Sequence, residues 1–538
     1  MTMRKTILLA GLTAAWAAPA PAQAPDIEAL AQARGITLPA AYYERVARDP
    51  DFFELRRGWR NRAPAGKGGA RSGISAAYLP RQGQLRMVVV MTLFEDSPQP
   101  PFSTEITHRQ LFGQNPLGNL TDFYREISGG RVNLTGNVLP WVRSSITITA
   151  ATGGSSLGLG ADAQLGLHMT DALQRLDGDV NFAQFDNDGP DGTPNSGDDD
   201  GYVDVAVFQY GEVAAACGGP GPWPHRGAIR GWTGQPYRTD DVRPDGQPVF
   251  VDDYIMQSVV DCDGEPQSIG TIAHETGHAF GLPDFYDPTG GLLPGQRRWV
   301  LGCWTLMAAG SWGCGDGARL GKVDTPSHMG AYEKQQLGWI DEAVAGVGSS
   351  TFTLPPVQAS GKSLRIPLRG AEEYLLLEYR PNTGFDRELP VGGVLMYHVD
   401  LSRPVLPCAT CPREYRVGLV EADGNGALVR TASEGGNRGE AGDVFTGTRT
   451  LTDATVPSLR LNSGQPSNLT LTITVENGQA RVQVLRRVVS QEQVLAPYLG
   501  GAALTVEEQV AVDALGNANG QFDLGDVRRF LRTSPAGE

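Results

Sequence analysis

The sequence has no cysteine before residue 217, no excess of positive charge, and no long apolar run after its first residues. Because residues 23–80 lack cysteine, no thiolate from that region can cap a metal ion. No later stretch is long enough to cross a bilayer, which argues against a membrane-spanning protein. The net charge of -15 argues against nucleic acid and anionic membranes as partners, whereas an acidic chain suits calcium binding.

The first residues have the pattern of an export signal. Arg4 and Lys5 precede an apolar run over residues 7–18, and Ala20-Pro21-Ala22 gives the small-x-small pattern of a secretory cleavage site. We therefore predict a signal peptide over residues 1–22 and a secreted protein, extracellular or periplasmic. The 6 cysteines fit an oxidising compartment and predict disulfides.

The stretch His274-Glu275-Thr276-Gly277-His278 reads HExxH. On a helix, residues four apart lie on one face, so His274 and His278 can direct two imidazoles at one ion, with Glu275 beside them as general base. Residues that would seat this helix in a core recur at three- and four-residue steps: Ile269, Ile272, Ala273, Thr276, Ala279 and Phe280. Gly281 ends the helix, because glycine adopts the left-handed conformation that turns the chain.

A residue beyond this turn can return to the metal as third ligand. Asp284 follows at the GxxD spacing, where metzincins usually have histidine, and Asp287 is the alternative if the turn is longer. Downstream, residues 303–312 read CWTLMAAGSW and look like a Met-turn, in which Met307 is an apolar floor under the ligands rather than core filler. Cys303 and Cys314 bracket this turn and are the disulfide pair we favour.

Together, HETGHAFGLPDFYD and WTLMAAGSW resemble the immune inhibitor A family of secreted bacterial zinc metallopeptidases. MVVVMTLFED and NLTDFYREISGGRVNLTGNVLPWV upstream, and HMGAYEKQQLGWI and GFDRELPVGGVLMYHVD downstream, also follow that family's pattern. The resemblance covers roughly residues 85 to 480. It implies a zincin fold, a zinc cofactor and hydrolysis of peptide bonds.

The expected fold class is α+β, with a metzincin-like zincin catalytic domain, a β-sandwich domain and a small helical calcium-binding tail. Residues 87–94 and 203–208 read as apolar strands and residues 119–128 and 163–176 as helices, whereas short alternating runs after residue 350 indicate the sandwich. The predicted divisions are a signal peptide (1–22), an N-terminal helical arm or propeptide (23–80), the metallopeptidase domain (81–345), the β-sandwich domain (346–488) and a dockerin-like module (500–538).

A carboxylate-rich loop precedes the HExxH helix. Asp186 and Asp188 are separated from Asp200 and Asp204 by a Gly-, Pro- and Asp-rich insertion, residues 189–199. Without the insertion the pieces join as DNDDGYVD, close to the spacing of an EF-hand-like calcium loop. Clustered carboxylates repel one another unless a cation neutralises them, so we predict these four as calcium ligands. A solvated acidic loop is the alternative.

The tail contains a second loop of this kind. Residues 516–531, GNANGQFDLGDVRRFL, resemble one half of a dockerin, a calcium loop that leads into a helix. With Gly520 at the sixth loop position, Asn517, Asn519 and Asp526 occupy ligand positions. The first loop position falls on Leu515 and the loop occurs once, so we predict a calcium-locked module, with contact to a cohesin-like or cell-surface partner as the lesser alternative.

These features predict a secreted zinc-dependent endopeptidase that acts on proteins or peptides. His274, His278 and Asp284 would hold the zinc, whose bound water has a lowered pKa, and Glu275 would take that water's proton and pass it to the leaving amine. The alternative is a non-catalytic exported binding or adhesion protein on a zincin scaffold. A broken HExxH or a lost Met-turn would mark that alternative, and both motifs are intact.

Overall fold

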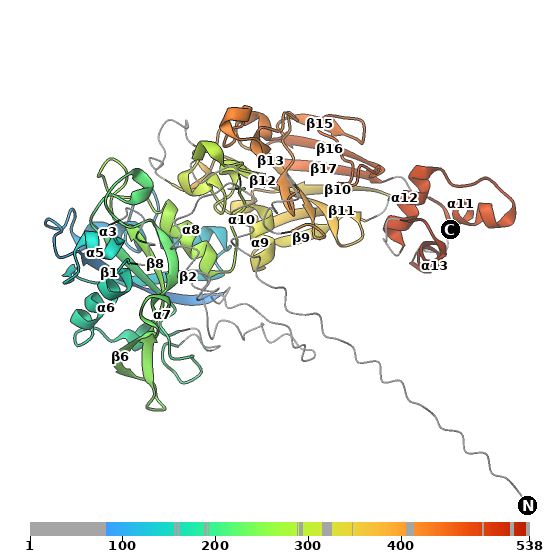
Figure 1. Ribbon diagram of the computed structural model, residues 1–538. Helices are drawn as coiled ribbons and strands as arrows, with labels where there is room; N and C mark the ends of the chain where they lie inside the picture. Colours follow the sequence, from blue (N-terminus) through green and yellow to red (C-terminus); the bar gives the residue numbers. More distant parts are fainter. Residues whose placement is uncertain are drawn as a thin grey trace, which may run out of the picture.

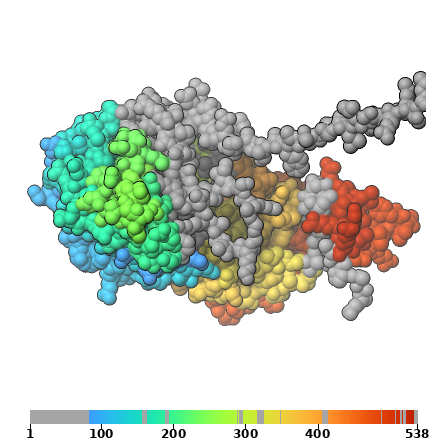
Figure 2. Space-filling model, turned by 90° about the horizontal axis from the view of Figure 1, so that it is seen from below, coloured from blue at the N-terminus to red at the C-terminus, as the bar shows by residue number. Residues whose placement is uncertain are grey.

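The computed structural model describes residues 82–533, apart from 155–157, 159–161, 188–190, 192, 288, 290–293, 315–324, 347, 405–413, 487–488 and 517–520. The predicted signal peptide and N-terminal arm, together with Asp188, Asn517 and Asn519, lie outside the described residues. Figure 1 shows three parts along the molecule: a mixed α/β part at one end, a β-rich part in the middle and a helical tail at the other end. Figure 2, from below, shows the same order.

A six-stranded sheet is the framework of the first part, with strand order β2-β1-β4-β8-β5 and a short β3 paired to β1. β1 is parallel to β2, β3 and β4, and β4 is parallel to β8, whereas the edge strand β5 is antiparallel to β8. The strands are β1 Gly83–Leu93, β2 Val132–Val138, β3 Val142–Arg143, β4 Val205–Tyr210, β5 His225–Ala228 and β8 Asp253–Ser258. β6 Tyr237–Val242 and β7 Pro248–Val251 form a separate antiparallel pair.

Helices cover both faces of this sheet. They are α3 Thr104–Leu111, α4 Leu120–Ile127, α5 Ile148–Thr152, α6 Leu165–Leu176, α7 Ile229–Thr233 and α8 Gly270–Ala279. The next helix, α9 Ala331–Leu337, lies beside the middle part of the molecule (Figure 1). Short 3-10 turns are η2 Phe182–Phe185, η3 Ala215–Cys217, η4 Pro294–Gln296, η5 Gly302–Trp304 and η6 Ala309–Trp312. A disulfide joins Cys217 of η3 to Cys262, which follows β8.

β1 shows why an almost continuous apolar run becomes a central strand. Its residues alternate between two cores: Met87 and Val89 belong to the core that contains α4 and α8, and Val88 and Val90 belong to the core that contains α6. A strand covered on both faces needs apolar residues at every position. The strand predicted at residues 87–94 and the helices predicted at 119–128 and 163–176 are therefore found as β1, α4 and α6.

Two antiparallel-rich sheets make up the middle part, with orders β14-β13-β12-β11-β9 and β10-β17-β16-β15. Their facing side chains, such as Ile366 and Leu377 in one and Ile473 and Val482 in the other, share one core. The strands are β9 Asp341–Val344, β10 Ser349–Leu354, β11 Lys362–Arg369, β12 Glu373–Arg380, β13 Gly393–Asp400, β14 Val417–Leu419, β15 Thr448–Leu451, β16 Leu469–Glu476 and β17 Gln479–Arg486. Short helical turns here are α10 Val357–Ser360, η7 Gly384–Asp386, η8 Ala427–Val429, η9 Ala432–Glu434 and η10 Ala441–Asp443.

The boundary between the first two parts is not where the sequence composition changes. β9 pairs in parallel with β11, so the five-stranded sheet begins at residue 341, before the division predicted at 345/346. β12 is buried on both faces: Leu375 and Leu377 face the core between the two sheets, and Tyr374 and Leu376 face the core that contains α8. The first part and this sheet therefore share one apolar interior.

The helical tail has a small core of its own. It comprises α11 Gln491–Leu495, η11 Ala496–Leu499, α12 Val506–Leu515 and α13 Leu524–Thr533, with Val494, Val512 and Phe530 buried among these helices. Across the residues that the structure describes, no helix combines the length and the apolarity that a membrane crossing requires.

Candidate metal centre

The HExxH motif lies on α8, as predicted. Ile272, Ala273 and Thr276 are buried in the core, and this seats the helix. The side chains of His274 and His278 are 12% and 17% exposed, with ring centroids 4.7 Å apart and ring planes at 90°. Two imidazoles one helical turn apart therefore face the same small space.

The end of α8 turns the chain back toward these rings. Gly281 has a φ of 97°, and its N–H bonds to the carbonyl of His278 while the N–H of Leu282 bonds to that of Gly277. This pair of bonds is a Schellman motif, which requires the left-handed conformation that glycine adopts without strain. Gly281 thus ends the helix in the way the sequence predicts.

Asp284 follows this turn and reaches both histidines. Its Oδ1 lies 3.0 Å from Nε2 of His274 and 3.5 Å from Nε2 of His278. The three side chains form one of the groups among the described residues whose potential ligand atoms lie within 4.8 Å of one another. Two imidazole nitrogens and one carboxylate oxygen are a donor set that suits a zinc site with a position left for water.

Backbone carbonyls set the orientation of both rings. Nδ1 of His274 donates to the carbonyl of Leu306 over 3.0 Å, and Nδ1 of His278 donates to that of Leu282 over 2.7 Å. Because each Nδ1 carries the donated proton, each Nε2 is the nitrogen available to a metal. A sequence motif cannot specify these carbonyl partners.

The charges of the site favour a cation. Burial alone would lower the pKa of His274, but the hydrogen bond and charge of Asp284, together with the charge of Glu275, raise it to about 9. Burial would raise the pKa of Asp284, yet the charge of His278 and hydrogen bonds from both histidines hold it well below its usual range. Asp284 is therefore a carboxylate throughout the physiological pH range, as a metal ligand needs to be.

Met307 lies beneath the helix. It is fully buried, and a Cβ on Gly277 would overlap its Sδ, so the methionine packs directly against the backbone between the two histidines. Its carbonyl accepts the N–H of Phe285, next to Asp284, over 2.8 Å, and its N–H donates to Oε1 of Glu333 on α9 over 3.1 Å. The turn around Met307 thus touches the helix, the Asp284 segment and α9.

Because Gly277 packs against Met307, the variant Gly277→Ala tests whether Met307 supports the HExxH helix. An alanine usually stabilises a helix interior relative to glycine, but here the added methyl must displace Met307, and we expect a loss of about 1–3 kcal/mol in the free energy of unfolding. Urea unfolding of Gly277→Ala, Met307→Ala and the double variant measures the coupling between them. Gly178→Ala is the control, because a Cβ there meets nothing within 4 Å. Additive losses in the double variant would contradict the contact.

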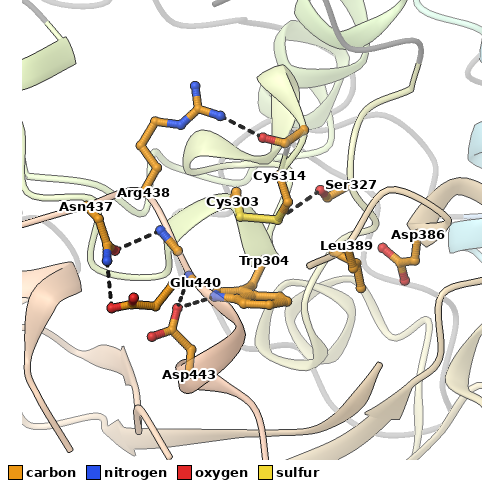
Figure 3. The surroundings of a disulfide bond; sticks show 12 residues. Cys303, Trp304, Cys314, Ser327, Asp386, Leu389, Asn437, Arg438, Glu440 and Asp443 are labelled. Atoms are coloured by element: carbon orange, nitrogen blue, oxygen red, sulfur yellow. Dashed lines mark hydrogen bonds between the residues drawn. A yellow bond between two sulfur atoms is a disulfide. The ribbon is translucent and has the colours of Figure 1, made fainter. Parts of the chain in front are cut away.

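A disulfide closes the segment that carries Met307, and it is the pair favoured from the sequence. Cys303 and Cys314 are bonded, with their Cα atoms 5.0 Å apart (Figure 3). Trp304, next to Cys303, is buried and donates its Nε1 to Oδ2 of Asp443 over 2.7 Å. The Met-turn is therefore anchored to the middle part of the chain.

Asp287, the alternative third ligand, is engaged elsewhere. It is 2% exposed, exchanges backbone hydrogen bonds with Arg298, and accepts the hydroxyl of Tyr415 at Oδ2 over 3.0 Å. Its Oδ2 also lies 3.5 Å from Nη1 of Arg298. These contacts give Asp287 a structural role away from the two histidines.

The predicted calcium ligands are only partly described. Asp186 and Asp204 are fully buried: Oδ2 of Asp186 accepts the N–H of Gly201, and Oδ2 of Asp204 accepts that of Asn187. Asp200 accepts the N–H of Tyr202. Among the described residues, Asp186, Asp200 and Asp204 do not form a group in which one carboxylate oxygen from each lies within 4.8 Å of the others. In the tail, Asp526 lies in the first turn of α13. It is buried and accepts the N–H of Asp523.

Two residues near the site have no role predicted from the sequence. Burial and the charge of Asp284 raise the pKa of Tyr286 far above its usual range, so Tyr286 stays a neutral hydroxyl beside the ligands. Burial raises the pKa of Glu333 to about 7, and its carboxyl holds the N–H groups of Gly330 and Met307. No spacing in the sequence points to Glu333, because only the fold brings it to the backbone N–H of Met307.

A helix that bears HExxH, a carboxylate that returns to both histidines and a methionine turn beneath them have the arrangement of a metallopeptidase site. Residues 102–340 match the family model described as immune inhibitor A peptidase M6, catalytic domain. The match confirms, for this segment, the resemblance that the motifs indicated.

Two relatives agree with the family match. "Immune inhibitor A" of Bacillus thuringiensis subsp. alesti is 27% identical over 241 residues, which are 39% of this chain and 32% of that protein. "Pre-pro-metalloprotease PrtV" of Vibrio cholerae serotype O1 (strain M66-2) is 28% identical over 214 residues, 37% of this chain and 22% of that protein. The chain thus spans about a third of the length of the first relative and less than a quarter of that of the second. The similarity supports a peptidase whose catalysis depends on a metal.

Proposed function

We propose that this chain is a secreted zinc-dependent endopeptidase. The observation that carries the proposal is the convergence of two imidazole Nε2 atoms and one carboxylate oxygen, from His274, His278 and Asp284. Both Nδ1 atoms already donate to backbone carbonyls, as the Nδ1 atoms of metal-binding histidines commonly do, which fixes the orientation of each ring. The names of the two relatives point to the same class of enzyme.

Each residue has a distinct part in this proposal. When bound, zinc would lower the pKa of a water and polarise the scissile carbonyl. His274, His278 and Asp284 would hold it, while Glu275 would accept the proton of the attacking water and deliver it to the leaving amine. The charge of Glu275 raises the pKa of both His274 and Tyr286, which supports this role for its carboxylate. Peptide hydrolysis then needs no covalent intermediate with the protein.

The fold is consistent with a zincin domain. α8 packs against a mixed sheet that is parallel except for its antiparallel edge strand β5. An edge strand has backbone groups that can pair with an extended peptide, so β5 is the strand along which we would place a substrate. The two packed sheets of the middle part fit the proposed β-sandwich domain.

Calcium and the tail complete the proposal. The buried carboxylates of Asp186 and Asp204, with Asp188 and Asp200 in the same loop, would be neutralised by calcium, and so would the tail loop of Asn517, Asn519 and Asp526. Gly516 lies directly against Asp526, so the two ends of the tail loop meet, as in a calcium-binding loop. A cohesin-like or cell-surface partner for this module remains part of the proposal.

Metal analysis and hydrolysis of an unfolded protein test the function together. We expect the purified protein to contain zinc, to cleave reduced casein within the chain, and to lose that activity with a zinc chelator and regain it when zinc is added back. A fluorogenic peptide library supplies the control for substrate preference. A folded, zinc-loaded protein that cleaves no peptide would instead support the non-catalytic scaffold.

A further inference from the structure

We propose that Glu421, Asp423 and Asp443 form a calcium site that fastens the segment 421–443 of the middle part onto the disulfide-closed Met-turn. The sequence analysis predicts no metal site at these three residues. Their carboxylates form a second group among the described residues in which one oxygen from each lies within 4.8 Å of the others.

The backbone brings the three side chains together. The N–H of Asp423 bonds to the carbonyl of Gly442 over 2.9 Å, and the N–H of Ala422 bonds to that of Asp443 over 3.0 Å. A Cβ on Gly442 would overlap the carboxylate of Asp423, so the two segments approach closely there. Backbone hydrogen bonds between residues 422–423 and residues 442–443 thus bring the three carboxylates together.

The deepest member of the cluster has an oxygen that is left for a ligand. Asp443 is 0% exposed, and its Oδ2 accepts both Nε1 of Trp304, over 2.7 Å, and the N–H of Glu440, over 2.9 Å. Its Oδ1 is buried and accepts no hydrogen bond from any residue that the structure describes. A buried carboxylate oxygen without a donor is costly unless a cation neutralises it.

Among the described residues, no positive side chain neutralises this charge. There Glu421, which is 6% exposed, accepts only backbone N–H groups, from Ala427 and Leu428, and Asp423 accepts the backbone N–H and the side-chain amide of Asn425. Within the described part of the chain, none of the three carboxylates forms an ion pair with lysine, arginine or histidine. These neutral donors orient the oxygens but leave the negative charges uncompensated.

Without a cation these groups resist ionisation. Burial and the charge of Asp443 raise the pKa of Glu421 to about 7, and burial and the charges of Asp423 and Glu440 raise that of Asp443 to about 6. A metal ion within the cluster would reverse both effects. Because all the donors are oxygens of carboxylates, a hard cation such as calcium fits them better than zinc does.

The position of the cluster gives the ion a structural role. The same segment bonds to the Met-turn region through Cys303 N–H to the carbonyl of Arg438 and through Nη2 of Arg438 to the carbonyl of Gly313 (Figure 3). Trp304 connects the disulfide to Asp443 directly. A cation that fixes Asp443 therefore fixes the tryptophan next to Cys303.

Terbium, a luminescent substitute for calcium, tests the proposal through Trp304. Because this indole donates to a carboxylate of the cluster, terbium bound there should emit on excitation of tryptophan. We expect Asp443→Asn and the exposed-site variant Asp423→Asn to weaken this emission by about tenfold or more at equal terbium, since calcium affinity follows ligand charge. Calcium should displace terbium from the parent and raise its melting temperature by linkage, but raise that of Asp443→Asn less.

A control variant separates this site from the other acidic groups. Asp240→Asn changes the trio of Asp177, Asp240 and Asp241, the third such group among the described residues, and should keep the tryptophan-excited emission. Unchanged emission and calcium response in Asp443→Asn and Asp423→Asn, or a parent in which calcium moves neither signal, would overturn the site in favour of a shared proton between Glu421 and Asp443.

Discussion

Glu275→Ala should keep its zinc and its fold and lose about a hundred- to ten-thousand-fold in the hydrolysis of an unfolded protein, the range that removal of a general base costs. Glu275 lies on α8 directly after His274, and the three converging donor atoms belong to His274, His278 and Asp284 instead. Its removal therefore takes away a proton acceptor and no metal ligand. Steady-state kinetics on one peptide, with zinc measured in the same sample, give the result.

Glu275→Gln is the matched control for shape, because it keeps the side-chain volume and removes only the basic carboxylate. It should behave as Glu275→Ala does, with unchanged zinc content and melting temperature. If the zinc-loaded Glu275→Ala protein hydrolysed peptides at close to the parent rate, another group would have to be the base.

Asp284→Ala should lose zinc, with a fall in affinity larger than the roughly 10- to 100-fold that loss of an outer partner costs. The reason is geometric, because Oδ1 of Asp284 is the oxygen that approaches both Nε2 atoms, at 3.0 and 3.5 Å. Competition for zinc with a chromogenic chelator measures the change independently of activity.

Asp287→Ala is the informative comparison. Asp287 holds Arg298 and the hydroxyl of Tyr415, so its loss should lower the free energy of unfolding by about 1–3 kcal/mol while zinc affinity changes little. Asp287→Asn should keep more of that stability. Zinc loss in Asp287→Ala with zinc retained in Asp284→Ala would reverse the assignment of the third ligand.

The local part of this site could be predicted from the sequence. The helix, its glycine end and the return of Asp284 depend on residues within about ten positions of one another, where spacing alone decides which side chains share a face. The Cys303–Cys314 disulfide was favoured for the same reason, since the two cysteines flank one turn. A sequence motif therefore predicts contacts between residues that lie close together along the chain.

The remainder depends on long-range packing. Glu333 reaches Met307 from α9, and Asp443 reaches Trp304 from a segment 139 residues away, so no spacing rule could pair them. The predicted division places residues 341–345 in the catalytic domain, but the hydrogen bonds of β9 go to β11. Partners of this kind follow from topology, which local patterns do not specify.

The core shared by α8, the Met-turn and β12 also changes what counts as the catalytic unit. The family similarity runs from residue 102 to residue 340, yet β1 lies before it, and Tyr374, Leu376 and Tyr397, which belong to the same core as Met307, lie after it. A fragment cut at those limits would lack β1. It would also expose to water the apolar side chains that pack against β12 in the whole chain. The segment that matches the family is thus smaller than the portion that must fold together for the two histidines to meet Asp284.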